Sequence, residues 1–484
     1  MSYQPLILTV TESSATTPVA CRLDPSSSML DKFAQFRELA YPAFLDSSLV
    51  TPGMGRYSYL TADPFLIVRS KGGHVQIETM GEVSHLESNP FAVLQELLDR
   101  YRLVQVPGLP PFQGGAIGYF SYELAHHIET LPYRAVDDLG LPEINVAFYD
   151  WAIAMDSASG ATWAIATGLP EGGRDQARQR LRWIEERLRH VRTASDYSGL
   201  SFKTENIISN YSRDEFLEAV ESVKEYIVRG DVYQVNISQR FEASVPCRPW
   251  ELYLRLRQVN PAPLSAYLHY PEVTVLSASP EEFLNLENGK VRTRPMKGTR
   301  PRGDTTQGDQ DLAQELRASE KDRAENVMIV DLMRSDLGKV CVPGSIQVPE
   351  LFTIEKYPTV FQMVSTICGQ LRPDVGTVAL LQACFPGGSV TGAPKIRAMQ
   401  IIDELEPSQR SVYCGAIGYI GFSGSMLMSI PIRILLVKGD RVYSQVGAGI
   451  VADSDPQAEY EETLHKARGA FRALGVQKRA VQPV

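Results

Sequence analysis

A run of uncharged residues at positions 411–432 constrains the fold of this chain more than any other feature. The run, SVYCGAIGYIGFSGSMLMSIPI, is long enough to cross a lipid bilayer as a helix, so a membrane span and a buried hairpin are both open to it. It is interrupted by Ser-Gly-Ser at 423–425, and glycines, a proline and strand-forming residues occur along it. This pattern predicts two buried strands joined by a tight turn rather than a transmembrane helix.

Helices and strands alternate irregularly along the rest of the chain. The sequence predicts an N-terminal β-rich region over 1–195, a serine-rich linker at 193–205 and a second region over 205–475. Because no steady strand–helix–strand repeat occurs, we expect an α+β fold, a large β-sandwich with mostly antiparallel sheets and outer helices. Helices are expected in the second region at 212–230, 308–338, 389–405 and 456–473.

Composition limits the classes of partner. The net charge of −9 argues against general nucleic-acid binding, because phosphate contacts need an excess of basic residues. The six cysteines contain no Cys-x-x-Cys pair, so neither a disulfide framework nor a zinc site is implied. The N-terminal stretch MSYQPLILTVTESS has no basic segment and does not resemble a signal peptide. We therefore expect a cytoplasmic protein that binds small molecules or other proteins, with no nucleic acid and no membrane as partner.

Lys297 lies among arginines in the segment TRPMKGTRPRG, residues 293–303. A lysine in such a cluster is usually a solvated charge or part of an anion-binding patch. The other interpretation is a nucleophile, and the residues around Lys297 alone do not decide between the two.

Two predicted helices each carry a pair of acidic residues three positions apart. Asp322 and Glu325 form one pair, and Glu459 and Glu462 form the other, just after Pro456 in the first helical turn. Two such faces brought together would hold a hard cation such as Mg²⁺, which typically takes one or two protein carboxylates with water and an anionic substrate group. Spacing alone equally allows two solvated helix faces.

Two glycine-rich segments and one arginine are further candidates. In FPGGSVTGAPKIR, residues 385–397, the hydroxyls of Ser389 and Thr391 precede a helix and could bind an anion, although an ordinary capping turn is equally compatible. Gly447 and Gly449 lack the third glycine of a dinucleotide loop, so they more plausibly let the backbone approach a ligand. Arg433, in the apolar segment SIPIRILLV, needs an anionic partner, either a structural carboxylate or a substrate.

Taken together and in order, these segments resemble the chorismate-utilising enzymes. The resemblance is close over about 205–470 and looser through PFQGGAIGYFSYEL in the N-terminal region, and it implies the fold of anthranilate synthase component I. The matching segments are GDVYQVNISQRF, SASPEEFL, RPMKGTRPRG, AENVMIVDLMRSDLG, FPGGSVTGAPKIRAMQ, GAIGYIG, VGAGIVADSDPQAEYEET and KAR.

Two positions bear on the reaction that this resemblance implies. Family members that add water to chorismate carry a lysine base where this chain has Gln234, and a neutral amide cannot take that proton at a useful rate. Anthranilate synthases carry alanine where this chain has Lys297, whereas lysine is typical of the aminodeoxychorismate synthases. The resemblance thus implies amination of chorismate at C4, towards p-aminobenzoate and folate.

The resemblance also assigns roles to individual residues. Lys297 would attack C2 of chorismate and Glu281 would protonate the departing C4 hydroxyl, after which ammonia would displace the lysine. The neighbouring arginines could keep Lys297 partly neutral by like-charge repulsion. Glu325 and Glu462 would hold Mg²⁺ against a substrate carboxylate, with Asp322 and Glu459 behind them. The residues expected to contact chorismate are Gly298, Thr299, Tyr419, Arg433, Gly447, Ala448 and Gly449.

Three departures from the family pattern are visible. Gln362 stands where many members carry a histidine linked to pyruvate elimination in anthranilate synthases, and Ser335 stands where Asn is common. Leu264 and Ser265 replace an aromatic residue and Met found in feedback-inhibited anthranilate synthases, so inhibition by tryptophan is not expected, although tryptophan could still bind as a structural ligand.

Ammonia must come from a partner. No segment carries the Gly-x-Cys-x-Gly nucleophile turn of a glutamine amidotransferase, so a separate glutaminase subunit is implied. Two alternatives to this assignment are an anthranilate synthase component I and a non-catalytic homologue that binds an aromatic metabolite. Retention of Lys297, Glu281, Glu325 and Glu462 argues against the second alternative.

Overall fold

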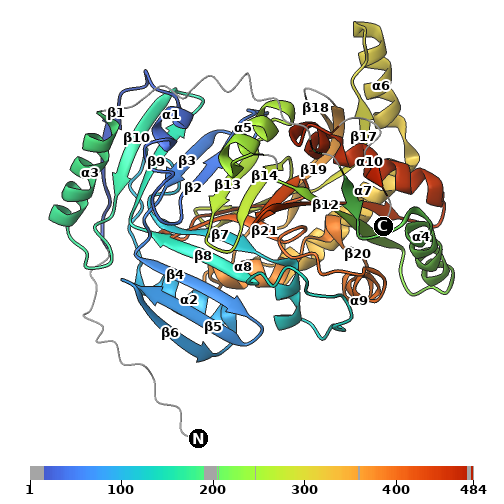
Figure 1. Ribbon diagram of the computed structural model, residues 1–484, viewed down its shortest axis with the longest axis horizontal. Coiled ribbons are helices and arrows are strands. Elements are labelled where there is room, and N and C mark those ends of the chain that lie inside the picture. The colour runs from blue at the N-terminus through green and yellow to red at the C-terminus, as the bar shows by residue number, and fades with distance from the viewer. Residues whose placement is uncertain are drawn as a thin grey trace, which may run out of the picture.

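The computed structural model describes residues 16–189, 204, 206–245, 247–357, 360–476 and 481–482. The predicted linker at 193–205 therefore lies almost entirely outside the described residues. Two large sheets face each other, and helices surround them at the edges (Figure 1). Apart from the pairing of β11 with β25, the strand pairs of the described sheets are antiparallel.

The first sheet has 13 strands, of which β20 (Gly392–Ala393) pairs with β12 off the main path. In spatial order the other strands are β1 (Val19–Leu23), β10 (Ala161–Ala166), β9 (Trp151–Asp156), β3 (Tyr57–Thr61), β2 (Ala43–Asp46), β13 (Leu264–His269), β14 (Thr274–Ser279), β23 (Ile434–Lys438), β24 (Arg441–Ile450), β12 (Gln234–Ser244), β11 (Ile207–Ser209) and β25 (Val481–Gln482).

The second sheet has 12 strands, of which β18 (Gln347–Lys356) pairs with β19 off the main path. The others are, in order, β17 (Met296–Pro301), β19 (Val360–Gln370), β16 (Lys290–Arg294), β15 (Glu282–Glu287), β22 (Met426–Ser429), β21 (Ala416–Gly421), β7 (Gly115–Phe120), β8 (Ile144–Tyr149), β4 (Leu66–Lys71), β5 (His74–Thr79) and β6 (Glu82–Glu87).

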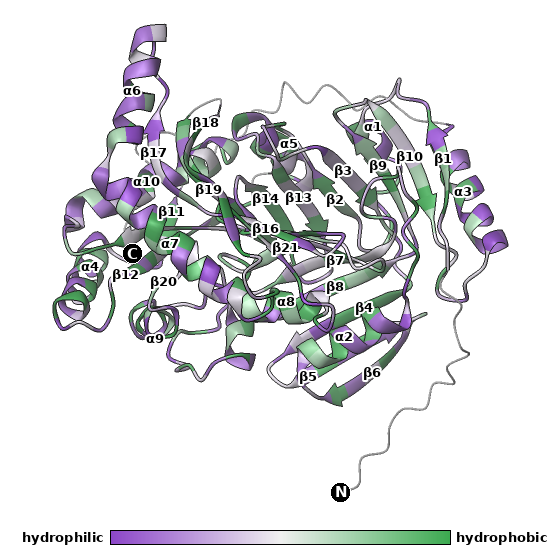
Figure 2. Cartoon of the chain, turned by 180° about the vertical axis from the view of Figure 1, so that it is seen from behind, coloured by the Kyte–Doolittle hydropathy of each residue, from purple (hydrophilic) through white to green (hydrophobic). Residues whose placement is uncertain are grey.

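The helices cover the outside of the sandwich. The α-helices are α1 (Met29–Phe33), α2 (Pro90–Arg100), α3 (Arg174–Leu188), α4 (Arg213–Val228), α5 (Pro249–Val259), α6 (Thr306–Ala318), α7 (Glu320–Gly338), α8 (Thr377–Cys384), α9 (Lys395–Leu405) and α10 (Pro456–Ala473), and the 3₁₀ helices include η1 (Tyr122–His127) and η3 (Gly388–Val390). Helix α6 projects from the body, and its side chains are mostly hydrophilic, whereas several central strands are hydrophobic (Figure 2).

Strands of the N-terminal and second regions share both sheets. Strand β2 pairs with β13 in the first sheet, and β7 pairs with β21 in the second. The buried apolar residues of both regions accordingly form shared clusters, one of which includes Val68, Phe120, Val235 and Ile417. The regions 1–195 and 205–475 are therefore interleaved in one sandwich, and the α+β prediction with mostly antiparallel sheets is confirmed.

The uncharged run 411–432 forms the predicted hairpin. Strands β21 and β22 pair with Ile417 opposite Ser429 and Tyr419 opposite Leu427, and the chain turns between them around Gly424. The run is buried because β21 lies in the middle of the second sheet, between β22 and β7. No helix of the described chain has the length and apolar character needed to span a bilayer.

Two helix predictions need correction. The range 308–338 is not one helix but two, because the chain extends at Ser319, whose hydroxyl accepts a hydrogen bond from the backbone N–H of Asp322 and so begins α7. The range 389–405 is helical only from Lys395 onward, after the short η3 turn and β20. By contrast α10 and α4 agree with the predictions, and α4 begins with a capping box of Ser212 and Glu215.

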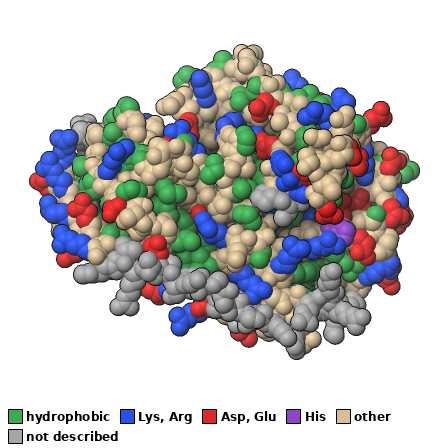
Figure 3. Space-filling view, turned by 90° about the horizontal axis from the view of Figure 1, so that it is seen from above, with side chains coloured by type: hydrophobic (Ala, Val, Ile, Leu, Met, Phe, Trp, Pro, Cys, Tyr) green, Lys and Arg blue, Asp and Glu red, His purple; other side chains and the backbone are tan. Residues whose placement is uncertain are grey.

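The surface mixes charges of both signs. Over the face shown in Figure 3, basic and acidic side chains are interspersed. This distribution agrees with the modest net charge of −9 and with the expectation that the partners are small molecules or proteins.

Candidate active site

Lys297 lies at an irregularity in the edge strand β17. Met296 pairs with Val364 and Thr299 with Gln362, so the register shifts between them and leaves Lys297 and Gly298 in a bulge. A bulge of this kind re-aims one side chain out of the regular alternation of a strand. Gly298 has a φ of +82°, a conformation that glycine adopts without steric cost. Gly298 and Thr299, which follow Lys297, therefore help to set the direction of its side chain.

We expect Gly298→Ala to lower both stability and turnover. A Cβ atom at this position would lie 2.9 Å from three atoms of the Asp322 side chain, besides occupying a left-handed conformation that costs about 1–3 kcal/mol. Gly344→Ala is the matched control, because Gly344 has a φ of +79° and no atom within 4 Å of such a Cβ. Thermal unfolding should show a loss for both variants, and a steady-state assay should show a large loss for Gly298→Ala alone. Equal activities in the two variants would contradict a role for the bulge in aiming Lys297.

The Lys297 ammonium group has no ionic partner among the residues that the structure describes. Its side chain is half-buried, and no carboxylate oxygen of those residues lies within 4.0 Å of it. Burial lowers its pKa, opposed by Glu325, and Lys466 lowers it further. A lysine with a lowered pKa and no salt bridge presents more of the neutral amine, which is the nucleophilic form.

The arginines beside Lys297 are not the cause of its lowered pKa, which corrects the expectation from sequence. Each of the three is engaged by carboxylates: Arg294 by Glu355, Arg300 by Glu315 and Asp322, and Arg302 by Asp309. Their charges are therefore largely compensated, and burial with the nearby Lys466 acts on the lysine instead.

Glu281 is buried, with 3% of its surface exposed, between β14 and β15. The hydroxyl of Ser389 donates a hydrogen bond to its Oε1 atom at 2.5 Å. Burial raises the pKa of Glu281 to about 7, although Ser389, Lys297 and the Met296 backbone hydrogen bond lower it. A carboxyl group with a pKa near neutrality can both donate and accept a proton at physiological pH.

Glu325 on α7 and Glu462 on α10 both act to raise the pKa of Lys297. Gln234 donates from Nε2 to Glu325 at 3.1 Å, and Lys466 donates to Glu462 at 2.7 Å. Glu462 is half exposed, so this end of the site is open to solvent.

A magnesium ion at these two carboxylates stays a prediction. The described residues contain no group of three or more metal-binding side chains, but Mg²⁺ commonly takes only one or two protein carboxylates and completes its shell with water and substrate oxygens. Of the two acidic residues expected behind them, Asp322 is paired with Arg300 at 3.2 Å and Glu459 accepts a hydrogen bond from Ser454 at 2.6 Å. These contacts orient both side chains behind the first pair.

The glycines of β24 form a wall of the site. A Cβ atom at Gly449 would lie 2.7 Å from Nε2 of Gln234 and 3.3 Å from Nζ of Lys297, so both side chains rest against the bare backbone. Lys466 donates to the carbonyl of Gly447 at 2.9 Å. Ala448 is fully buried in the core, so only its backbone is available here. The approach of a ligand to these two glycines stays a prediction.

Arg433 precedes β23 and finds no carboxylate partner within 4.0 Å in the described chain. Burial lowers its pKa, and Tyr357 is the group that acts in the opposite direction. A guanidinium group in such a place is costly without an anion. The structure thus favours the second of the two interpretations, a partner that comes from outside the chain.

Three residues expected at the substrate lie elsewhere or are otherwise engaged. Tyr419 packs its ring against Tyr59 at 5.5 Å and Phe112 at 4.9 Å and lines a separate cavity between the sheets, because the register of β21 turns it away from β17. Thr391 is fully buried, and its hydroxyl donates to the carbonyl of Gly387 within its own turn. Ser389 contacts Glu281 rather than open space.

The comparisons with known proteins agree with this arrangement. Residues 59–472 match the sequence signature of the family described as chorismate binding enzyme. The chain belongs to this family. It is 42% identical to aminodeoxychorismate synthase component 1 of Salmonella typhimurium over 91% of this chain and 95% of that protein, and 38% identical to anthranilate synthase component 1 of Acetivibrio thermocellus over 91% and 92%. The crystal structure of anthranilate synthase component I from Streptococcus pneumoniae superposes with a TM-score of 0.77 at 32% identity, covering 85% of this chain and 91% of that one.

Two residues of this chorismate binding enzyme lie at the site but were not predicted from the sequence. Lys466 touches both Glu462 and the carbonyl of Gly447, and its spacing of four residues after Glu462 was a usable signal. Asn236 lies two positions after Gln234 on the same face of β12. Its buried Oδ1 atom has no hydrogen-bond partner among the residues that the structure describes, and it lies 2.5 Å from a Cβ placed on Gly447. No pattern in the sequence distinguishes Asn236 from an ordinary strand residue.

The two residues whose roles the sequence left open differ in placement. Gln362 is buried opposite Thr299, which is itself exposed, and its Oε1 atom has no partner in the described chain. Ser335 is exposed on the outer side of α7, so its departure from the family pattern does not affect the site.

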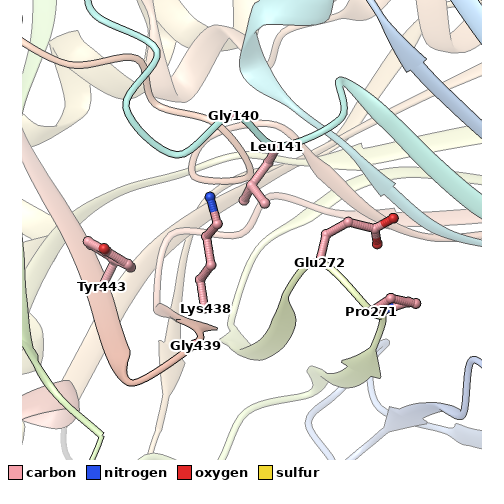
Figure 4. A pocket seen from close by; sticks show the side chains of 7 residues that line it. All are labelled: Gly140, Leu141, Pro271, Glu272, Lys438, Gly439 and Tyr443. Carbon is pink, nitrogen blue, oxygen red and sulfur yellow. The ribbon is translucent and has the colours of Figure 1, made fainter.

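An open surface cavity of about 580 Å³ lies away from these residues. It is lined by Gly140, Leu141, Pro271, Glu272, Lys438, Gly439 and Tyr443 (Figure 4). Lys438 points toward Gly140 and Leu141 there and donates to the carbonyl of Leu139. None of the residues predicted to bind chorismate or metal lines this cavity.

Proposed function

We propose that this chain is the chorismate-aminating component of an aminodeoxychorismate synthase. It would convert chorismate and ammonia to 4-amino-4-deoxychorismate, the precursor of p-aminobenzoate in folate biosynthesis. The observation that carries the proposal is Lys297, a half-buried amine without a salt bridge that faces Glu281, Glu325 and Glu462. Relatives named aminodeoxychorismate synthase component 1 match over nearly their whole length, which supports the same assignment.

The first half of the reaction forms a covalent bond to the enzyme. The neutral amine of Lys297 attacks C2 of chorismate, both double bonds of the ring diene shift, and the bond between C4 and its hydroxyl oxygen breaks. Protonated Glu281 gives its proton to the leaving hydroxyl, so that water departs, and the new secondary amine loses one proton. Glu281 suits this role because burial holds its pKa near 7.

The second half reverses the shift with a different nitrogen. Ammonia attacks C4 and loses a proton, both ring double bonds move back, and the C2–N bond breaks, so that Lys297 leaves as a free amine after gaining a proton. One substitution at a single carbon is thus divided into two easier steps. The enolpyruvyl group is untouched in both.

The remaining residues bind and orient chorismate. Glu325 and Glu462 would hold Mg²⁺, which, when bound, neutralises a substrate carboxylate. Arg433 would bind an anionic group through its uncompensated guanidinium. The bare backbone of Gly449 lets the Lys297 amine lie against β24, where an added Cβ atom would come within 3.3 Å of its Nζ atom.

Product analysis tests the proposal. The protein, incubated with chorismate, Mg²⁺ and ammonia, should yield a product in which an amine replaces the C4 hydroxyl and the enolpyruvyl ether remains. Mass spectrometry would show this product, whereas an anthranilate synthase would release pyruvate and fluorescent anthranilate. Anthranilate as the main product would contradict the proposal, and no product at all would favour a non-catalytic homologue.

A glutaminase subunit would supply the ammonia. We expect the purified chain to use ammonium salts at raised pH but not glutamine. Burial raises the thiol pKa to about 11 or beyond in Cys21, Cys247, Cys384 and Cys414, so these cysteines are poor nucleophiles. None of the six cysteines of the chain lies in a glutaminase motif. An assay with glutamine as the sole nitrogen source checks this, and turnover by a homogeneous preparation would contradict it.

Because all six cysteines are free thiols, we place the reaction in the cytoplasm.

Tryptophan is a proposed structural ligand of the separate cavity between the sheets. Tyr59 and Tyr419 line it with aromatic rings, and its Asp46 carboxylate is paired with Arg257 at 2.6 Å. The cavity measures about 30 Å³, so the side chains around it would have to move apart to admit an indole ring. Leu264 and Ser265, the two departures from inhibited relatives, also line it. We expect tryptophan to be recovered by acid extraction of the purified protein without inhibiting turnover, and an empty extract would remove it as a ligand.

A further inference from the structure

A buried ion network lies directly behind the site, and the mechanism above does not use it. Arg410 is 2% exposed and Glu406 is 4% exposed. The guanidinium donates from Nε and Nη2 to the two oxygens of Glu406 at 3.0 and 2.7 Å. Both residues lie in the segment that connects α9 to β21. Burying such a pair is costly unless every donor is satisfied, so its remaining contacts are informative.

The other contacts of Arg410 are two backbone carbonyls where the η3 turn meets β12, a junction at which the Asn236 N–H also donates to the carbonyl of Thr391 at 2.8 Å. Nη1 donates to the carbonyl of Val390 at 2.8 Å, and Nη2 donates to the carbonyl of Asn236 at 2.7 Å. Val390 follows Ser389, whose hydroxyl holds Glu281 at 2.5 Å. Asn236 lies two residues after Gln234, whose amide contacts Glu325 at 3.1 Å. One side chain thus connects the turn that supports the proton donor with the strand that supports the proposed metal ligand.

The network is anchored on both sides. Glu406 also accepts hydrogen bonds from the backbone N–H and the hydroxyl of Ser238, each at 2.8 Å. Glu123, from the N-terminal region, accepts from the backbone N–H groups of Arg410 at 2.7 Å and Ser411 at 3.2 Å. The Arg410 guanidinium lies 4.7 Å from the centre of the Tyr122 ring. These contacts leave the guanidinium little freedom, and they join η1 of the N-terminal region to the site.

We propose that Arg410 is a positioning residue that aligns Ser389 with Glu281 and β12 with Glu325 without touching the substrate. The inference rests on the proposed function, because it assigns Arg410 to the same reaction. Displacement of the Val390 carbonyl would misalign the Ser389 hydroxyl with Glu281. A misplacement of about 1 Å at a site of this kind can lower the rate by about 100-fold.

Arg410→Lys tests the proposal, because lysine keeps the charge but cannot make all four hydrogen bonds. We expect kcat at pH 7 and constant free ammonia to fall by about 10-fold or more. The alkaline limb of the pH–rate profile should also move upward by about half a pH unit or more. The hydrogen bond from Ser389 lowers the pKa of Glu281, as Lys297 and the Met296 N–H also do, and the substitution would weaken the Ser389 hydrogen bond. Ser389→Ala should give the same upward shift, and the double variant should add little to it.

Arg69→Lys is the matched control, because Arg69 is a largely buried arginine paired with Glu78 and Glu272 in the N-terminal strands. It should lower thermal stability without moving the profile. If Arg410→Lys does not fold, Glu406→Gln, which weakens the hold on Arg410, should move the limb in the same direction by a smaller amount. A folded Arg410→Lys or Glu406→Gln enzyme whose profile falls uniformly with pH would overturn the proposal. Failure of the parent protein to aminate chorismate would instead overturn the proposed function.

Discussion

The Lys297→Ala variant should aminate C4 of chorismate more than about 1,000-fold more slowly than the parent protein, and it should remain folded. The lysine has no salt bridge or hydrogen bond to lose in the described chain, so its removal leaves no partner unsatisfied. The shortened side chain leaves a space beside Gly449 that ammonia can enter. We therefore expect slow residual amination in which the amine appears at C2 instead of C4, because ammonia then makes the first attack itself.

The measurement is product analysis by mass spectrometry and NMR, with thermal unfolding as the test of folding. Lys438→Ala, in the open cavity away from the site, is the control and should keep the parent activity. If the Lys297→Ala enzyme produces the C4 amine at the parent rate, Lys297 is a solvated charge, which is the other interpretation of the arginine-rich segment 293–303.

Glu325→Gln and Glu462→Gln should each abolish detectable turnover at physiological Mg²⁺. Both changes keep the shape of the side chain but remove one of two anionic oxygen ligands, and Mg²⁺ binds neutral amides poorly compared with carboxylates. Half of the Glu462 side chain is exposed, so the protein can hydrate the new amide and should stay folded. Isothermal titration calorimetry should show loss of Mg²⁺ binding in the presence of chorismate for either variant.

The control for this pair is Glu461→Gln, next to Glu462 on α10. Glu461 is exposed, and Gln457 donates to it at 3.1 Å. This variant should keep both Mg²⁺ binding and turnover. Full activity of Glu325→Gln or Glu462→Gln at limiting Mg²⁺ would remove the residue concerned from the metal site.

Features set by local spacing were predictable from the sequence. The capping box of Ser212 and Glu215 fixes the start of α4, and Pro456 fixes the start of α10, because each acts within one helical turn. The hairpin of 411–432 followed from a turn signal inside an uncharged run. The break at Ser319 was missed because the surrounding residues RASEKDRAE contain no glycine or proline that would signal it, and the cap contact with Asp322 reveals it.

Features set by packing across the sandwich were not predictable. Tyr419 lies in a matching motif, but the strand register places its ring against Tyr59, and register cannot be read from one strand. The lowered pKa of Lys297 was expected, but its cause was not, since ion pairs such as Arg300 with Glu315 join residues on different elements. Arg410 gave no signal, because its role depends on carbonyl groups far away in the chain.

The most direct test of the central claim, that Lys297 is a nucleophile, is a search for the covalent intermediate. With chorismate and Mg²⁺ but no ammonia, the first attack can occur and the second cannot. After rapid acid quenching, part of the protein should carry an adduct equal in mass to chorismate less one water, and peptide mapping should place it on Lys297 within PMKGTRPR. An adduct mapped to another residue, or none in an enzyme that turns over normally once ammonia is added, would contradict the account.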